Sequence, residues 1–246
     1  MDSNWIAYWN QDSAMTGDLW PAQSDFFVRQ IQKILSFGPD DLLLDIGCGH
    51  GHGIAALAQS VKEAHGADTS AYCVRQAAAR FAGRGNLHFH QLPPENYLAL
   101  ETLPVRGLTR IICVSVVQYY KCIDELQTLI RNANNIAAPG CHMLLADLLV
   151  DYSLCKDIAG VLLGGLLSGT FTAKLQEVFS GHHGSYKKTR KQNPLLMPSY
   201  EELRRIAREE NALLRFIPRN LTGNCFRAHA LFELPGNGGG TCLNPG

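Results

Sequence analysis

The chain has 246 residues, of which 46% are hydrophobic and 18% are charged, and its formal net charge at pH 7 is zero. This length and composition suffice for a full hydrophobic core, in one large domain or one domain with an elaboration. The neutral charge excludes a global field that attracts nucleic acid or a membrane, so a polyanion would need a local basic patch.

The cysteine content and the N-terminal residues indicate the cellular compartment. The eight cysteines include no CxxC pair, which argues against a zinc ribbon or a thioredoxin-like site, and we expect no metal site. The start MDSNWIAYWNQDS has neither the basic nor the apolar region of a secretory signal. The longest apolar run, residues 158–167, is shorter than the roughly 20 residues of a membrane span. We therefore predict a reduced, cytoplasmic protein.

Strand and helix patterns alternate along the first half of the chain. An apolar stripe predicts a helix over residues 25–37, and a short apolar run predicts a buried strand over 42–46. A helix over 51–60 follows, and a second strand ends near Asp68. Ser70 is the expected cap of the next helix. A strand over 86–91 completes this half.

The second half continues the alternation and then departs from it. Strands are predicted at 110–117 and 143–149, with a helix over 124–138 between them that ends at Pro139-Gly140. Such alternation predicts a parallel sheet with helices on both faces. After a break, Ser199 and Glu202 form a capping box that starts another helix. Two further strands are predicted, at 213–217 and 226–234.

We predict a single domain over residues 1–246 with three additions. Residues 1–38 form an N-terminal helical segment, and residues 151–197 interrupt the alternation as an inserted helical cap. The glycine-rich residues 235–246 are expected to be a disordered tail.

The stretch DIGCGHGHG, residues 45–53, follows the first strand and opens the first helix of the sheet. In open α/β sheets the ligand binds at this turn, where glycines let the backbone approach it. Dinucleotide folds use G-x-G-x-x-G, whereas here the spacing is G-x-G-x-G and His52 stands at the third glycine position. Asp45 would lie awkwardly close to a pyrophosphate, and its carboxylate suits a cationic ligand better.

These residues resemble a known family. LLLDIGCGHG is similar to motif I of the class I S-adenosylmethionine-dependent methyltransferases, and RIICVSVVQYY and AAPGCHMLLADLL resemble the fourth and fifth strands of that family. The resemblance covers about residues 25–150 and, more loosely, 199–234. It implies a Rossmann-like doubly wound sheet of about seven strands, mostly parallel with an antiparallel C-terminal strand.

The resemblance also implies S-adenosylmethionine as the cofactor. Asp68, 19 residues after Gly49, corresponds to the acid that binds both ribose hydroxyls, although capping of the next helix is its alternative role. Trp9 and Tyr8 belong to an aromatic segment that either packs on the core or closes over the cofactor. The predicted cofactor-binding residues are Asp45, Gly47, Cys48, Gly49, Gly51, Asp68, Thr69, Gln91, Leu92, Ser115, Tyr8 and Trp9.

The acceptor site is less well defined by the sequence. Gln118, Tyr119 and Tyr120 follow the fourth strand and either line the substrate pocket or belong to the core. His182 and His183 in the cap are candidates for a general base, with Tyr119 as another catalytic candidate, and a solvated loop is the alternative for the histidines. The basic residues 187–191 are interpreted as a solvated loop, with an acidic substrate or RNA as the alternative.

We therefore expect a methyltransferase that moves a methyl group to a small, fairly apolar metabolite by in-line displacement. Two alternatives stay open, an NAD(P)-dependent oxidoreductase and a non-catalytic protein of the same fold. The G-x-G-x-G spacing argues against the first, and the intact glycines with Asp68 argue against the second. The identity of the acceptor atom and the oligomeric state do not follow from the residues.

Overall fold

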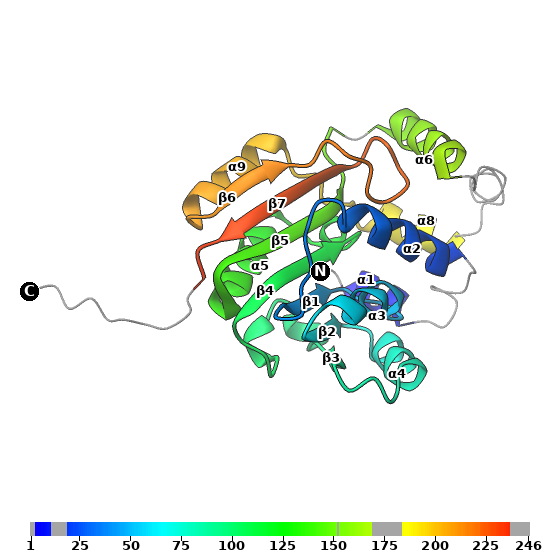
Figure 1. Ribbon diagram of the computed structural model, residues 1–246. Coiled ribbons are helices and arrows are strands. Elements are labelled where there is room, and N and C mark those ends of the chain that lie inside the picture. Colours follow the sequence, from blue (N-terminus) through cyan, green and yellow to red (C-terminus); the bar gives the residue numbers. More distant parts are fainter. Residues whose placement is uncertain (1–2, 11–18, 152, 169–183, 237–246) are drawn as a thin grey trace, which may run out of the picture.

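The computed structural model describes residues 3–10, 19–151, 153–168 and 184–236. A twisted central sheet carries helices on both of its faces (Figure 1). The candidate bases His182 and His183 lie outside the described residues, as do residues 237–246 of the predicted tail.

Seven strands form one sheet in the order β3-β2-β1-β4-β5-β7-β6. All neighbouring pairs from β3 to β5 are parallel, and β7 is antiparallel to both β5 and β6. The predicted fold, mostly parallel with an antiparallel C-terminal strand, is therefore confirmed. The strands are β1 (Leu42–Ile46), β2 (Glu63–Asp68), β3 (Leu87–Gln91), β4 (Leu108–Val114), β5 (Ala137–Leu148), β6 (Leu213–Phe216) and β7 (Ala228–Leu234).

The strand order reverses between β1 and β4, because the chain runs outward from β1 to β3 and then returns to the other side of β1. The carboxyl ends of β1 and β4 therefore form the topological switch point, where open α/β sheets bind their ligands.

Two hydrophobic clusters cover the two faces of the sheet. Ile111 and Ile112 are neighbours in β4 and are both almost fully buried, yet they belong to different clusters. A strand buried on both faces accounts for the unbroken apolar run from which β4 was predicted. The helices are α1 (Ser3–Trp9), α2 (Leu19–Ile31), α3 (His52–Leu57), α4 (Ala71–Arg80), α5 (Ile123–Ile136), α6 (Leu154–Ser168), α8 (Gly184–Gln192) and α9 (Tyr200–Glu209).

Helices α1, α5 and α9 pack in the cluster on one face, and α2 and α3 pack in the cluster on the other. Two helix starts follow the predicted capping chemistry. The Ser70 hydroxyl accepts a hydrogen bond from the Cys73 backbone N–H at 3.2 Å at the start of α4, and Ser199 and Glu202 form the capping box of α9.

Several predicted boundaries were wrong. Helix α2 ends at Ile31 rather than near residue 37. Strand β4 ends at Val114, because Ser115 adopts a φ of 59° that leaves the extended conformation. The predicted Pro139-Gly140 turn lies inside β5, which begins at residue 137; Gly140 has a φ of 76° there, next to a shift in the register between β4 and β5.

The residues predicted as a cap contain α6 and α8. A Cβ at Gly160 or Gly164 would overlap Asn224 or Gly223, so these glycines let α6 pack closely on the segment before β7. The basic residues 187–191 lie in helix α8 and not in a loop. Lys188 and Lys191 are exposed to solvent, as expected. Within the described residues, no helix combines the length and apolar character that a membrane span requires.

Candidate active site

The glycine loop joins β1 to α3 at the switch point. Gly47, Gly49 and Gly51 have φ values of 78°, 53° and 76°, a conformation that L side chains rarely adopt. A Cβ at Gly47 would also overlap the Val116 side chain, and one at Gly51 would lie 2.6 Å from the Phe89 ring. Both backbone conformation and close packing therefore require glycine in this loop.

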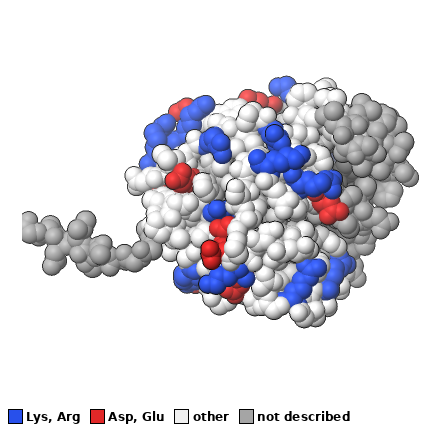
Figure 2. Space-filling view, viewed as in Figure 1, with Lys and Arg blue, Asp and Glu red and all other residues white. Residues whose placement is uncertain are grey.

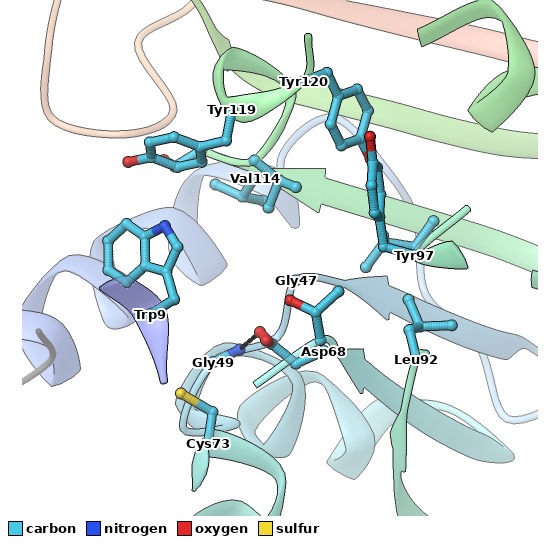
Figure 3. Close-up of a pocket in the computed structure, with 14 residues that line it drawn as sticks. Trp9, Gly47, Gly49, Asp68, Cys73, Leu92, Tyr97, Val114, Tyr119 and Tyr120 are labelled. Carbon is cyan, nitrogen blue, oxygen red and sulfur yellow. Dashed lines mark hydrogen bonds between the residues drawn. The ribbon is translucent and has the colours of Figure 1, made fainter. Parts of the chain in front are cut away.

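Asp68 connects the glycine loop to the start of α4. Its Oδ2 atom accepts a hydrogen bond from the Gly49 backbone N–H at 2.9 Å, and its Oδ1 atom accepts one from the Ser70 N–H at 2.8 Å. The first of these bonds lies at the edge of the cavity drawn in Figure 3. The Thr69 backbone also bonds to this carboxylate, and the Asp68 side chain lines the first cavity, where a ligand can reach it.

Asp45, at the end of β1, is a second carboxylate in poorly solvated surroundings, and it is 8% exposed. Burial, and then the charge of Asp68, raises the pKa of Asp45 to about 7. Burial also raises the pKa of Asp68, against the opposing effect of its backbone hydrogen bonds. A positively charged ligand would stabilise both ionised carboxylates, so the electrostatics of the loop favour a cation.

A first cavity, of about 120 Å³, opens above Asp68 between aromatic side chains (Figure 3). Trp9 of α1 and Tyr119 after β4 lie on one side, with ring centroids 5.4 Å apart. Tyr97 and Tyr120 lie on the other, with centroids 5.7 Å apart. The lining residues are Trp9, Ile46, Gly47, Gly49, Asp68, Thr69, Cys73, Leu92, Tyr97, Val114, Ser115, Val116, Tyr119 and Tyr120.

A second cavity, of about 320 Å³, lies beside the first at the ends of β4 and β5. Phe27 of α2 and Val161 of α6 line it together with polar side chains. The two cavities share Gly47, Gly49, Val114, Ser115 and Tyr119. The other residues that line the second cavity are Ser24, Asp45, Cys48, His50, His52, Gly53, Ile112, Gln118, Asp147, Thr222, Gly223, Asn224 and Arg227.

Asp147 is held at the end of β5 by a polar network. It has a φ of 67°, and strained backbone of this kind often occurs at functional sites. Its Oδ2 atom accepts from the Ser115 hydroxyl at 2.6 Å, its Oδ1 atom accepts from Thr222 at 3.1 Å, and the Arg227 guanidinium lies 3.6 Å from Oδ1. The Asp147 backbone N–H donates to Nδ1 of His229 at 3.1 Å.

The structure brings most of the predicted cofactor residues to these cavities. Those at the first cavity are Trp9, Gly47, Gly49, Asp68, Thr69, Leu92 and Ser115, and Asp45 and Cys48 line the second. Of the predicted acceptor residues, Gln118 lines the second cavity, Tyr120 the first and Tyr119 both.

Three predicted cofactor residues line neither cavity. Tyr8 is 4% exposed and packs edge-on against Trp9, with centroids 4.9 Å apart, so it belongs to the core. Gln91 is exposed, because strand alternation directs it away from the side on which its neighbour Leu92 is buried. Gly51 is buried beneath Phe89 and shapes the loop from behind.

Sequence reasoning missed several residues of the two cavities. Cys73 lies in the first turn of α4 after Asp68, so its position near the site could have been inferred from the helix start. Tyr97 comes from irregular 3₁₀ turns between β3 and β4, where no periodicity indicates the direction of a side chain. Asp147 was predicted only as part of the fifth strand. It lines the second cavity and has a positive φ of 67°, which the sequence pattern does not indicate.

Comparison with known proteins agrees with this geometry. Residues 44–143 match the family model described as "Methyltransferase domain". Chondramide synthase cmdD of Chondromyces crocatus is 28% identical over 141 residues, which are 55% of this chain and 4% of that protein. The chain therefore spans only a small part of that curated relative.

Solved structures share the fold at low sequence identity. Phosphoethanolamine N-methyltransferase 1 of Haemonchus contortus, in complex with phosphoethanolamine and S-adenosylhomocysteine, has a TM-score of 0.63 and 14% identity over 95% of this chain and 49% of its own. N-methyltransferase NodS of Bradyrhizobium japonicum WM9, in complex with S-adenosylhomocysteine, has a TM-score of 0.57 and 13% identity over 95% of this chain and all of its own. Magnesium protoporphyrin IX methyltransferase of Synechocystis PCC 6803 has a TM-score of 0.53 and 16% identity over 94% of this chain and 91% of its own.

The described chain shares its fold with these solved methyltransferases. The match over residues 44–143 shows that this part of the chain is similar to a methyltransferase domain, as the resemblance predicted.

Proposed function

We propose that this chain binds S-adenosylmethionine and transfers its methyl group to a small molecule. The observation that carries the proposal is a pair of carboxylates beside the glycine loop at the switch point, the buried Asp45 and the half-buried Asp68, both with a raised pKa. S-adenosylmethionine carries a sulfonium and an ammonium and no phosphate, so its charge matches this pair. A dinucleotide would bring a negatively charged pyrophosphate to the same place.

The residues at the two cavities suit the parts of this cofactor. Asp68 lines the first cavity and is the acceptor that we assign to the ribose hydroxyls, and Leu92 offers an apolar surface to the adenine. Asp45 would stabilise the ammonium group through its negative charge. Gly47 and Gly49 allow the backbone to approach the bound molecule without a Cβ in the way.

In methyl transfer the protein mainly positions the reactants. It need not activate the leaving group, because the sulfonium leaves as a neutral thioether. The chain must hold the acceptor about 3 Å from the methyl carbon and exclude water. Trp9 of α1 lines the first cavity, and Tyr119, which follows β4, lines both cavities. We assign the exclusion of water to these two rings, whose centroids are 5.4 Å apart. Ser24 and Phe27 of α2 and Val161 of α6 line the second cavity, and we assign these helices a covering role.

Charge and cavity size favour a small acceptor over a nucleic acid. The net charge is zero, and charged side chains are scattered in small groups over the face shown in Figure 2, with uncharged areas between them. The second cavity holds about 320 Å³ and is adjacent to the glycine loop, so it offers room for a small molecule beside the cofactor.

Thermal unfolding with S-adenosylmethionine, S-adenosylhomocysteine or NADH tests the proposal. A ligand at about 100 times its Kd adds about 2.7 kcal/mol to the free energy of unfolding, which raises the Tm of a chain of this size by about 5–10 °C. We expect a shift with the first two ligands and none with NADH. A shift with NADH alone would identify an oxidoreductase, and no shift with any ligand would favour a non-catalytic protein.

A further inference from the structure

We propose that the second cavity takes an amine on an apolar body, and that the amine nitrogen, held by Gln118 and Asp147, is the atom that is methylated. This inference rests on the proposed function and specifies its acceptor. It is carried by an unpartnered buried amide and a positioned carboxylate in one cavity.

Gln118 provides the first hydrogen-bond acceptor. It lies in the 3₁₀ turn Val117–Tyr119 directly after β4, is 7% exposed and lines the second cavity. Its Oε1 atom is buried and has no hydrogen-bond partner among the described residues. The backbone is held in place, because the Gln118 carbonyl accepts from the Leu196 N–H at 2.9 Å. A buried carbonyl oxygen without a donor is unfavourable, so a ligand that donates a hydrogen bond to it gains affinity.

Asp147 provides the second acceptor. Its carboxylate lines the second cavity and is held in place by the Ser115 and Thr222 hydroxyls, which donate to Oδ2 and Oδ1. Ser115 is shared by both cavities, so this carboxylate lies close to the place where the cofactor site and the second cavity meet. The φ of 67° at Asp147 is consistent with a side chain that is held in place for function.

Among possible methyl acceptors, an amine suits the Gln118 and Asp147 oxygens best, because it donates the most hydrogen bonds to them. An ammonium donates three hydrogen bonds and a neutral primary amine donates two, whereas a hydroxyl donates one and a carboxylate none. The charge of Arg227 in the cavity is opposed by Asp147, whose Oδ1 atom lies 3.6 Å from the guanidinium, so an acidic ligand meets no unopposed arginine there. Phe27, Ile112 and Val161 also line the cavity, among its polar residues, and offer contacts to an apolar body.

The proposed step balances as follows. The ammonium form of the acceptor gives one proton to the Asp147 carboxylate, which frees the nitrogen lone pair. A nitrogen–carbon bond then forms as the bond between the methyl carbon and the sulfur breaks, and the sulfur keeps that electron pair as a neutral thioether. The product is a protonated N-methylamine, and the Asp147 proton passes to solvent.

Binding of matched probes to the protein saturated with S-adenosylhomocysteine tests the inference. The probes are 2-phenylethylamine, 2-phenylethanol and 3-phenylpropanoate, which share one apolar body and differ in the polar group. By calorimetry we expect the amine to bind at least about tenfold more tightly than either other probe. With S-adenosylmethionine, mass spectrometry should detect the N-methyl product of the amine only.

Variants of Gln118 and Asp147 test whether these two residues bind the amine. Q118L should weaken amine binding about tenfold, whereas Q118E, which keeps an acceptor oxygen, should bind the amine within about threefold of the wild type. D147N should reduce the preference for the amine over the alcohol about tenfold. Q76L and D40N make the same chemical changes at exposed positions outside both cavities and should change nothing.

The outcomes separate this inference from the proposed function. If S-adenosylhomocysteine does not bind, the proposed function fails, and this inference fails with it. If it binds, the inference is overturned when the amine does not bind, when the alcohol or the acid binds equally well, or when amine binding is unchanged in both Q118L and D147N. Unchanged affinity for S-adenosylhomocysteine in Q118L shows that the variant is folded.

Discussion

Asp68 has two tasks that a single substitution can separate. It fixes the glycine loop through the Gly49 N–H at 2.9 Å, and in our proposal it also accepts from the ribose. D68N keeps an acceptor oxygen but loses the charge, and it should weaken S-adenosylhomocysteine binding by about 10- to 100-fold, because hydrogen bonds to a charged group contribute about 1.5–3 kcal/mol. Calorimetry measures this loss. D40N, at an exposed site, is the control, and an unchanged Kd in D68N would remove the ribose assignment.

Asp45 makes cofactor affinity depend on pH. Its pKa is raised to about 7 in the free protein, so below pH 7 a growing fraction is neutral and attracts a cation less. Between pH 7.5 and pH 6 the Kd for S-adenosylmethionine should rise about eightfold, which follows from the fraction of Asp45 that is ionised. D45N should bind S-adenosylmethionine more weakly, with a Kd that is nearly constant over this pH range. An equal pH dependence in the wild type and in D45N would show that another group titrates.

The residues of the site differ in how far sequence could identify them. Gly47 and Gly49 could be predicted because a left-handed loop favours glycine, and Asp68 was predicted from the family resemblance. Tyr8 was also predicted from that resemblance, whereas its helical spacing indicated packing, and it is 4% exposed and lies in the core. Spacing places Tyr8 and Trp9 on one helix, but only packing decides which of the two rings lines the cavity.

Among the secondary-structure elements, α6 packs unusually closely on the rest of the chain. Gly160 and Gly164 are one helical turn apart, and they face Asn224 and Gly223 of the segment before β7. This segment and Val161 of α6 both line the second cavity, so the docking of α6 shapes that cavity.

G164A tests this packing against helix propensity. Alanine in a helix is favoured over glycine by about 1 kcal/mol, so propensity alone predicts a more stable α6. The added Cβ would instead overlap the Gly223 carbonyl, and overpacking typically costs about 1–3 kcal/mol. We expect faster hydrogen exchange across α6 in G164A. G85A, where a Cβ meets open space, is the control, and slower exchange in G164A would contradict the packing.

Element boundaries were predicted well where a local signal exists. Ser70 and the Ser199–Glu202 capping box start their helices as predicted, because capping hydrogen bonds join residues within four positions. The ends of β4 and the start of β5 were wrong, because Ser115 and Gly140 take positive φ values. Contacts with distant strands determine these conformations, and no local pattern indicates them.

For the whole molecule, buried histidines link stability to pH. Burial, and then the charge of Arg227, lowers the pKa of His229 to about 4, and burial lowers the pKa of His65 to about 4. Each histidine is neutral in the folded chain but binds a proton below about pH 6.5 when unfolded. Their contribution to stability is therefore complete above about pH 6.5 and is lost as the pH falls toward 4.

H229N tests this linkage. The asparagine Oδ1 atom can accept the Asp147 N–H that now donates to His229 at 3.1 Å, and it does not titrate. Between pH 7 and pH 4.5 the wild type should lose on the order of 2 kcal/mol more of its free energy of unfolding than H229N does. Urea unfolding at both pH values measures the difference. An equal loss in the two proteins would show that His229 is protonated or solvated in the folded state.

The sequence by itself determined the fold class and the place of the site. Apolar alternation, capping residues and the glycine loop after β1 are local, and they suffice for a parallel doubly wound sheet whose ligand site lies at the carboxyl ends of its strands. The tertiary structure decided which side chains meet there. The raised pKa of Asp45, the isolation of the Gln118 amide and the network around Asp147 all depend on burial between segments far apart in the chain. Burial depends on packing in three dimensions, and residue order alone does not specify it.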